Sequence, residues 1–201
     1  SNGEVYLPHR LFRLENKFTQ VIADMELNRV PFNPEVWLKI AEEQEGVYNE
    51  RLEILNKYIE QFYPKFVEAE NLFNLHRRCM VEWSSSKQVI ELFRYLDICP
   101  KEFSKSTKKM DWTVGAVALL KTLDNKYKDS YMEQNWQGFE VDESGNFIED
   151  NQRLILAYLL FKRAEQNITT FGREWLKYVH PITKRVHTNF RQILNSGRMA
   201  S

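Results

Sequence analysis

Apolar residues recur at helical spacing along much of the chain, and this pattern predicts its main elements. Residues 11–25 place their apolar positions on one face, which indicates an amphipathic helix that Pro31 terminates. A second helix is predicted from Asn33, a good capping residue followed by Pro34 in the first turn, to about Ile59. These two segments predict a pair of long antiparallel helices.

Three more helices are predicted further along the chain. Tyr63-Pro64 breaks the helical pattern, and Ser85-x-x-Gln88 then has the spacing of a capping box at the start of a short helix. Another short helix is predicted at residues 114–123. A long helix is predicted from about Asn151 to His180, where the following proline halts it.

Extended structure is predicted in two places. Residues 138–141 and 146–148 flank Asp-Glu-Ser-Gly, which favours a small β-hairpin, and residues 185–190 alternate like a strand whose partner would lie beyond the end of the chain. Residues 101–113 are rich in Lys and Ser with little periodicity, so they are predicted to be an exposed loop. The sequence therefore predicts a mainly α fold.

Composition narrows the class of protein. A chain of 201 residues is long enough for one elongated domain with a substantial core. It contains no apolar run long enough for a membrane span and no secretion signal, and Cys79 and Cys99 do not make a disulfide framework. We therefore expect a reducing cytoplasm, and we interpret the opening Ser-Asn-Gly as the remnant of a tag.

Charge is balanced overall, with 28 basic and 28 acidic residues, but it is distributed unevenly. Residues 1–75 carry 13 acidic and 8 basic side chains, a net charge of −5, whereas residues 162–201 carry 2 acidic and 8 basic side chains, a net charge of +6. The equal totals argue against a protein that coats nucleic acid with its whole surface. If nucleic acid binds, the second half is expected to bind it.

Two polar groups have the chemistry for phosphate contact, and each also has a simpler explanation. The first group combines hydroxyls, one positive charge and a predicted helix N-terminus, and it consists of Ser84, Ser85, Ser86 and Lys87. An ordinary capping box is the alternative, and the residues by themselves favour it. The second is a basic segment that consists of Lys105, Ser106, Thr107, Lys108 and Lys109; a solvated charge run is its alternative.

Catalytic and metal sites are not indicated by the sequence. His187 has no acidic or cysteine partner at ligand spacing, and His76 with Cys79 would make only two ligands. The acidic residues near Asp24 and Glu43 lie on helices whose other face is apolar, as solvated side chains do. We predict no catalytic residue and no metal ligand.

Four blocks, in the same order, resemble family A DNA polymerases of the bacterial polymerase I type. Residues 18–34 are similar to the helix that follows the exonuclease domain, residues 83–93 (Trp-Ser-Ser-Ser-Lys-Gln-Val-Ile-Glu-Leu-Phe) to the thumb tip, and residues 157–171 to the returning thumb helix. Residues 184–201 contain a basic residue, His-Thr, an aromatic residue, Gln and then Gly-Arg-Met-Ala-Ser. This last block resembles the passage from the thumb into the palm.

The resemblance implies an elongated, mainly α thumb subdomain with long antiparallel helices, a small helical tip and a C-terminal extended palm segment. Residues 1–10 would be a tag or the end of an exonuclease region, residues 11–180 the thumb, and residues 181–201 the start of the palm. Residues 125–150, which contain the predicted hairpin, match no block and would be an insertion.

The resemblance also implies which side chains face DNA. Lys162 and Arg163 lie one turn before the lysines of the family's returning helix, and Arg198 stands where an arginine reaches the minor-groove side of the primer terminus. An arginine there can donate to acceptors that every correct base pair presents, so it tests shape without choosing sequence. The other positions implied to line the duplex are Arg185, His187, Thr188 and Gln192.

The intact protein would be a DNA-directed DNA polymerase of replication or repair, in a bacterium or a phage-infected host. It would use two Mg²⁺ ions on palm aspartates and bind dNTP, but none of those aspartates is in this chain, whose expected partner is primer-template duplex, bound as a monomer. A helical protein-interaction or scaffolding domain without nucleic-acid binding is the alternative. A phage or mobile-element nucleic-acid enzyme of different chemistry is a third interpretation.

Overall fold

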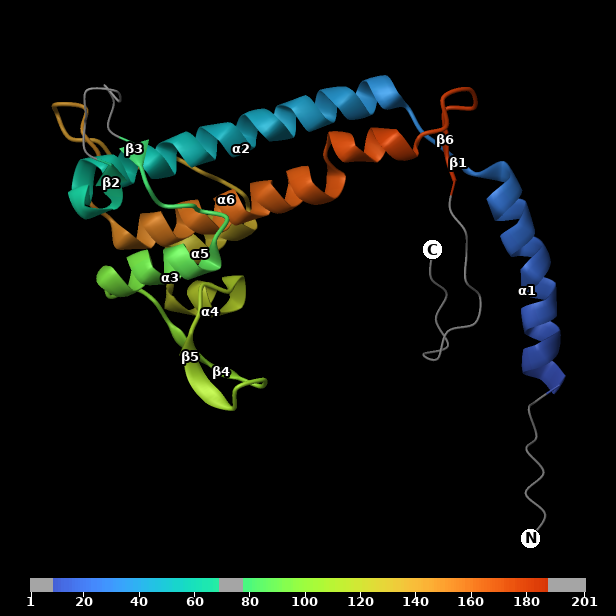
Figure 1. Cartoon of the computed structure of the whole chain (residues 1–201), viewed down its shortest axis with the longest axis horizontal. Helices are drawn as coiled ribbons and strands as arrows, with labels where there is room; N and C mark the ends of the chain where they lie inside the picture. The colour runs from blue at the N-terminus through green and yellow to red at the C-terminus, as the bar shows by residue number, and fades with distance from the viewer. Residues whose placement is uncertain (1–8, 69–77, 188–201) are drawn as a thin grey trace, which may run out of the picture. The chain divides into compact units, whose positions relative to one another are not determined.

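The computed structural model describes residues 9–68 and 78–187, and it is mainly helical (Figure 1). Those residues contain six α-helices: α1 (His9–Asn28), α2 (Pro34–Phe62), α3 (Ser86–Tyr95), α4 (Ala116–Thr122), α5 (Asn125–Met132) and α6 (Asn151–Phe171). They also contain two 3-10 helices, η1 (Pro64–Phe66) and η2 (Arg173–Tyr178). Six short strands complete the fold: β1 (Val30–Pro31), β2 (Val67–Glu68), β3 (Arg78–Cys79), β4 (Lys101–Ser104), β5 (Lys109–Trp112) and β6 (Arg185–Val186).

The strands form three two-stranded antiparallel sheets, and the chain divides into two compact units. The sheets pair β1 with β6, β2 with β3, and β4 with β5. The larger unit runs from Glu42 to Gly172, and the smaller unit joins the chain up to Ala41 to the chain from Arg173 onward.

The larger unit is built on α2 and α6, which lie antiparallel. The side-chain amide of Asn167 donates to Gln44 at 3.0 Å, whereas the Asp150 amide, at the other end of α6, donates to the Tyr58 hydroxyl at 2.8 Å. Between them the Tyr48 ring lies 5.2 Å from that of Phe161. The sequence predicted residues 11–25 as the antiparallel neighbour of this helix, but the helix that packs along it in the larger unit is α6.

The core surrounds the middle of α6. Every residue from Leu154 to Phe161 is buried, as expected for a helix that is apolar on all sides. Tyr158 contacts the rings of Trp83 and Phe93, and Tyr58 of α2 stacks on Phe139 at 4.2 Å. Trp83 is 1% exposed and donates its indole N–H to Asn56, so it belongs to the core.

Two helix starts show how local sequence acts. The Asn33 side chain accepts hydrogen bonds from the Glu35 and Val36 amides, which confirms the predicted cap of α2. The predicted capping box of α3 is wrong: Ser85 stands at the N-cap without a side-chain bond, and Gln88 instead accepts from the Glu82 amide at 2.8 Å. A tight turn explains this, because the Ser85 amide already donates to the Glu82 carbonyl.

The segment before α6 differs from its prediction. It begins with α5, which was not predicted, and the predicted hairpin consists of one bridge between Val141 and Phe147 around a turn held by the Asp142 carboxylate. The backbone groups of Phe147, which face away from Val141, bond to the Gln61 side chain.

Residues 101–113 form a β-hairpin rather than the predicted loop. Lys101 pairs with Trp112, and Ser104 pairs with Lys109 across the sheet. Lys108 closes the turn with a left-handed φ of 53° and donates its amide to Ser104 at 2.8 Å. The predicted exposure was correct, since every residue of the two strands except Ser104 is exposed.

The end of the long C-terminal helix was also predicted only in part. Helix α6 stops at Phe171, and η2 continues to Tyr178, just before the predicted boundary at His180. At Gly172 the chain leaves the α6 helix so closely that a Cβ atom would overlap the carbonyl oxygen of Ile168. Gly172 therefore sets the boundary between the two helical segments.

In the smaller unit, the strand at residues 185–186 finds its partner inside the chain. Val186 pairs with Val30, and Arg185 pairs with Pro31. The expectation that this strand pairs with residues beyond the end of the chain is wrong for Arg185 and Val186. The centre of the Trp37 ring lies 5.1 Å from that of Phe32 and 6.0 Å from that of Trp175, so both tryptophans pack within this unit.

Candidate nucleic-acid interface

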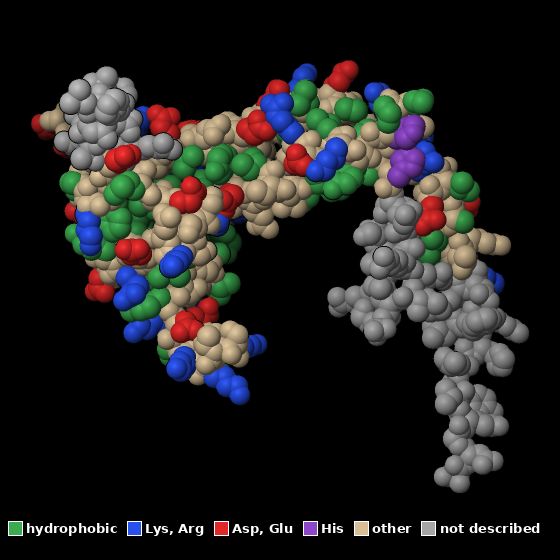
Figure 2. All heavy atoms as spheres, in the orientation of Figure 1, with side chains coloured by type: hydrophobic (Ala, Val, Ile, Leu, Met, Phe, Trp, Pro, Cys, Tyr) green, Lys and Arg blue, Asp and Glu red, His purple; other side chains and the backbone are tan. Residues whose placement is uncertain are grey.

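The β4–β5 hairpin carries a group of exposed cations at its turn. Lys105, Lys108 and Lys109 are exposed, and none of them forms an ion pair with another described residue. Thr107, also exposed, donates its hydroxyl to Asp111 at 2.5 Å. Figure 2 shows Lys and Arg side chains gathered at the end of this projection. The structure thus presents these side chains to solvent, as the sequence indicated.

The start of α3 presents a second polar group, and its three serine side chains differ in their hydrogen bonds and exposure. Ser84 donates its hydroxyl to Glu165 of α6, and Ser85 occupies the N-cap position without a side-chain bond to the helix. Ser86 and Lys87 are exposed in the first turn. The Ser84 hydroxyl therefore bonds to another residue of the fold. The backbone amides of the first turn of α3 do not donate to the Ser85 side chain.

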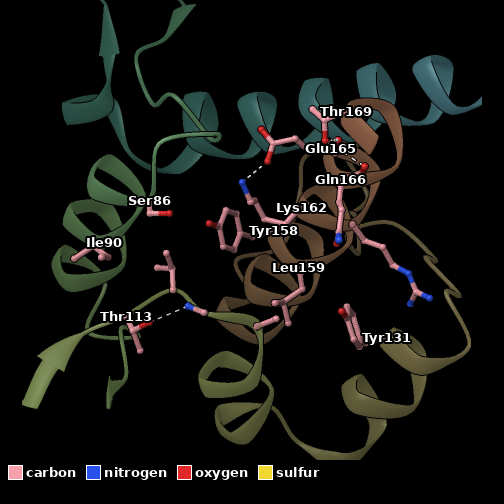
Figure 3. A pocket seen from close by; sticks show the side chains of 14 residues that line it. Ser86, Ile90, Thr113, Tyr131, Tyr158, Leu159, Lys162, Glu165, Gln166 and Thr169 are labelled. Carbon is pink, nitrogen blue, oxygen red and sulfur yellow. Dashed lines mark hydrogen bonds and ion pairs between the residues drawn. The ribbon is translucent and has the colours of Figure 1, made fainter. Parts of the chain in front are cut away.

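A pocket of about 740 Å³ lies beside the start of α3, between α3, the segment before α4, the end of α5 and the second half of α6 (Figure 3). Tyr158 is 1% exposed, yet its hydroxyl points into this pocket and has no hydrogen-bond partner among the described residues. Burial, and next the Glu165 carboxylate, raise the pKa of Tyr158, so the hydroxyl is neutral and able to donate.

The charged side chains of the pocket come from α6. Lys162 and Glu165 form an ion pair across one turn, so much of the Lys162 charge is neutralised. The guanidinium of Arg163 lies 5.8 Å from the centre of the Tyr131 ring and forms no ion pair within the parts of the chain that the structure describes. The pocket therefore holds two cations and one carboxylate, with Arg163 as its unpaired cation.

The same carboxylate affects Tyr48 on α2. Burial, and next the Glu165 charge, raise the pKa of the Tyr48 hydroxyl. Two of the predicted residues, Ser84 and Lys162, therefore bond to the Glu165 carboxylate, and a third, Ser86, lines the same pocket.

The predicted C-terminal group is only partly described. Arg185 is exposed and donates to the carbonyl oxygen of Asn28, next to the β1–β6 pairing. His187 is exposed, and its ring lies 5.2 Å from that of His180. Slight desolvation, followed by the charges of Arg29 and His180, lowers the pKa of His187, which favours the neutral imidazole. Thr188, Gln192 and Arg198 lie outside the described residues.

Sequence reasoning did not single out the Glu165 carboxylate or the two tyrosines of the pocket. The Tyr158 ring lies on the apolar pattern of the long helix, but that pattern contains nothing that places its hydroxyl against a cavity. Tyr131 lies on α5, a helix that was not predicted. Both positions depend on how α3, α5 and α6 meet, and a linear pattern does not contain that information.

No group of three His, Cys, Asp or Glu side chains that could hold a metal ion is found in residues 9–68 and 78–187. None of the helices in those ranges is both long and apolar enough to cross a membrane. Comparison of the chain with protein-family models, with curated protein sequences and with solved structures found no match.

Proposed function

We propose that this chain is the DNA-gripping thumb region of a family A DNA-directed DNA polymerase. In this proposal α2 and α6 are the long thumb helices, and α3, α4 and the β4–β5 hairpin form the tip. The positions of two of the sequence blocks support the proposal. Residues 83–93 contain the start and first two turns of α3, and residues 157–171 are the part of α6 after Leu156, which packs against α2.

The hairpin cations are the single observation that carries the proposal. Lys105, Lys108 and Lys109 are exposed and free of ion pairs within the described chain, so contact with phosphate would not require breaking a bond inside the protein. Phosphate contacts position a protein on duplex DNA without reading its sequence. The thumb would therefore bind primer-template duplex with little sequence preference.

The start of α3 would add a second phosphate site. The amides of its first turn, the Ser86 hydroxyl and Lys87 face solvent or the pocket, and the Tyr158 hydroxyl can donate from the pocket's wall. Arg163 would supply an unpaired cation on the same side of α6. Arg185, His187, Thr188, Gln192 and Arg198 would follow the duplex towards the palm.

Catalysis would belong to the remainder of the polymerase. Palm aspartates outside this chain would hold the two Mg²⁺ ions of nucleotidyl transfer, while the residues of this chain hold and orient the duplex. This division predicts DNA binding without nucleotide incorporation.

The test is a salt titration of primer-template binding, measured by fluorescence anisotropy with a labelled duplex. Lys108→Ala combined with Lys109→Ala removes two phosphate contacts, so the slope of log affinity against log salt should become shallower by about 1.8. Lys39→Ala with Lys57→Ala removes the same charge from exposed positions of α2 and should leave the slope unchanged. Absence of binding by the folded wild-type chain at low salt would overturn the proposal.

A specific feature of α1 favours the protein-interaction alternative as a second candidate. Phe18, Val21 and Met25 lie on one face of this helix and are 38%, 47% and 42% exposed. Such an apolar stripe suits contact with another protein. Sedimentation velocity distinguishes this candidate, because Val21→Asp would then remove a concentration-dependent association that the wild type shows.

A further inference from the structure

The two faces of the β4–β5 hairpin differ in chemistry. Successive side chains of a strand point to opposite faces, and paired residues of neighbouring strands share a face. The register therefore places Glu102, Ser104, Lys109 and Asp111 on one face, and Lys101, Phe103, Met110 and Trp112 on the other. We call the second set the aromatic face.

On the first face, which we call the polar face, both carboxylates have partners within the protein. Glu102 forms an ion pair with Lys121 of α4 at 3.4 Å, and Asp111 accepts a hydrogen bond from Thr107. Because both carboxylates of the hairpin lie on this face, the aromatic face carries no acidic residue. Its only charged residue is Lys101.

On the aromatic face, Phe103 and Met110 are uncovered. They pair directly across the two strands, and each is 59% exposed. The Phe103 ring makes no ring contact with any other described residue. Because more than half of each side chain faces solvent, this pair contributes little to the stability of the fold. The pair is therefore available to a partner.

Trp112 is held differently. The Lys101 ammonium lies 4.3 Å and the Arg94 guanidinium 5.2 Å from the centre of its ring, and Trp112 is 36% exposed. These cation–π contacts fix the base of the aromatic face and bring two positive charges to its edge. At the other end of the hairpin, Lys105 and Lys108 lie in the turn that follows Ser104, whereas Lys109 belongs to the polar face.

The aromatic face offers an exposed apolar ring next to positive charges and carries no carboxylate. Such a surface suits a ligand that has both many negative charges and exposed aromatic rings. Base pairs in duplex DNA hide their faces in the stack, whereas unpaired bases present them to aromatic side chains. The aromatic rings of an acidic protein are largely buried in its fold, and a lipid surface offers charge with flexible chains. The chemistry of this face therefore fits single-stranded nucleic acid best.

We propose that the aromatic face is a stacking site for unpaired bases, with Phe103 as the stacking ring and with Lys101, Lys105 and Lys108 on the adjoining phosphates. This inference rests on the proposed function, in which the same hairpin lies against DNA. It deepens that function because it assigns the hairpin a second substrate form, the single-stranded segment next to the duplex.

The test measures the affinity of the whole chain for a labelled oligothymidylate and for an abasic strand of equal length and charge. Phe103→Ala should weaken binding to the oligothymidylate by about fivefold or more, the effect expected for loss of one stacked base, and should leave binding to the abasic strand unchanged. Phe18→Ala, which removes an exposed ring from α1, is the matched control and should change neither affinity.

The inference fails if Phe103→Ala binds the oligothymidylate as tightly as the wild type does, or if it loses equal affinity for the oligothymidylate and the abasic strand. A separate assay measures binding to phosphatidylserine vesicles. If Phe103→Ala loses vesicle binding and keeps oligothymidylate binding, the inference also fails. The two proposals also fail separately. If primer-template binding persists while Phe103→Ala has no effect, only the stacking site fails. If Phe103 matters for the single strand but the duplex is not bound, only the thumb function fails.

Discussion

The side-chain amide of Gln61 on α2 bonds to both backbone groups of Phe147: Nε2 donates to the carbonyl oxygen at 2.8 Å, and Oε1 accepts from the amide at 3.0 Å. The side chain thus takes the place of a neighbouring strand, next to a hairpin that has a single bridge. This pairing attaches the segment before α6 to the larger unit, and the Phe147 ring completes the attachment by packing 5.2 Å from Phe139.

Gln61→Ala should therefore destabilise the larger unit. Two hydrogen bonds are lost, and each contributes on the order of 1 kcal/mol, so the free energy of unfolding should fall by about 1–2 kcal/mol in a urea titration. Gln20→Ala, at an exposed position of α1, corrects for helix propensity. Equal effects of the two substitutions would show that the pairing contributes nothing.

Glycine substitutions at two positions should have opposite signs. At Gly172 an added Cβ overlaps the Ile168 carbonyl oxygen, so Gly172→Ala should lower the unfolding free energy by about 1–3 kcal/mol. At Gly46, within α2, nothing lies within 4 Å of the added atom, so Gly46→Ala should raise it by up to about 1 kcal/mol. Thermal unfolding followed by circular dichroism measures both, and destabilisation at Gly46 would contradict the expected difference.

Alkaline pH should unfold the protein through its buried tyrosines. Burial, as the largest cause, raises the pKa of Tyr58 to about 12 and also raises that of Tyr158. The unfolded chain loses these protons near pH 10, so stability is fully present below pH 10 and falls as the pH rises towards about 12.

Tyr158→Phe isolates this effect, because its hydroxyl has no hydrogen-bond partner among the described residues. We expect nearly unchanged stability at pH 7 and a higher midpoint of alkaline unfolding. Tyr58→Phe is the comparison, since it also loses the bond from the Asp150 amide and should be less stable at pH 7. An unchanged alkaline midpoint for Tyr158→Phe would refute the assignment.

Glu165→Gln tests the electrostatics of the pocket. The substitution removes the carboxylate that pairs with Lys162 and accepts from Ser84, so it frees a positive charge beside the start of α3. If phosphate binds there, affinity for primer-template DNA should increase several-fold at low salt, with a steeper salt dependence. Glu53→Gln, which frees Lys57 on α2, should leave affinity unchanged. Equal affinity for both variants would place the pocket outside the interface.

The sequence predicted the helices well because their signals are local. Apolar spacing, the Asn33 cap and the break before Pro64 each act within a few residues, and α2, α3, α4 and most of α6 lie where these signals indicated. The exposure of the hairpin lysines was also readable, because a run of Lys and Ser has nothing to bury.

Tertiary structure alone decided which segments meet. Strand pairing joins residues far apart in the chain, so the sequence did not indicate that β6 would pair with β1, nor that Gln61 would occupy the place of a strand beside Phe147. The pocket depends in the same way on the meeting of α3, α5 and α6. Periodicity shows that the Tyr158 ring is buried, but only the packed helices determine that its hydroxyl faces a cavity, because that cavity is made by their neighbours.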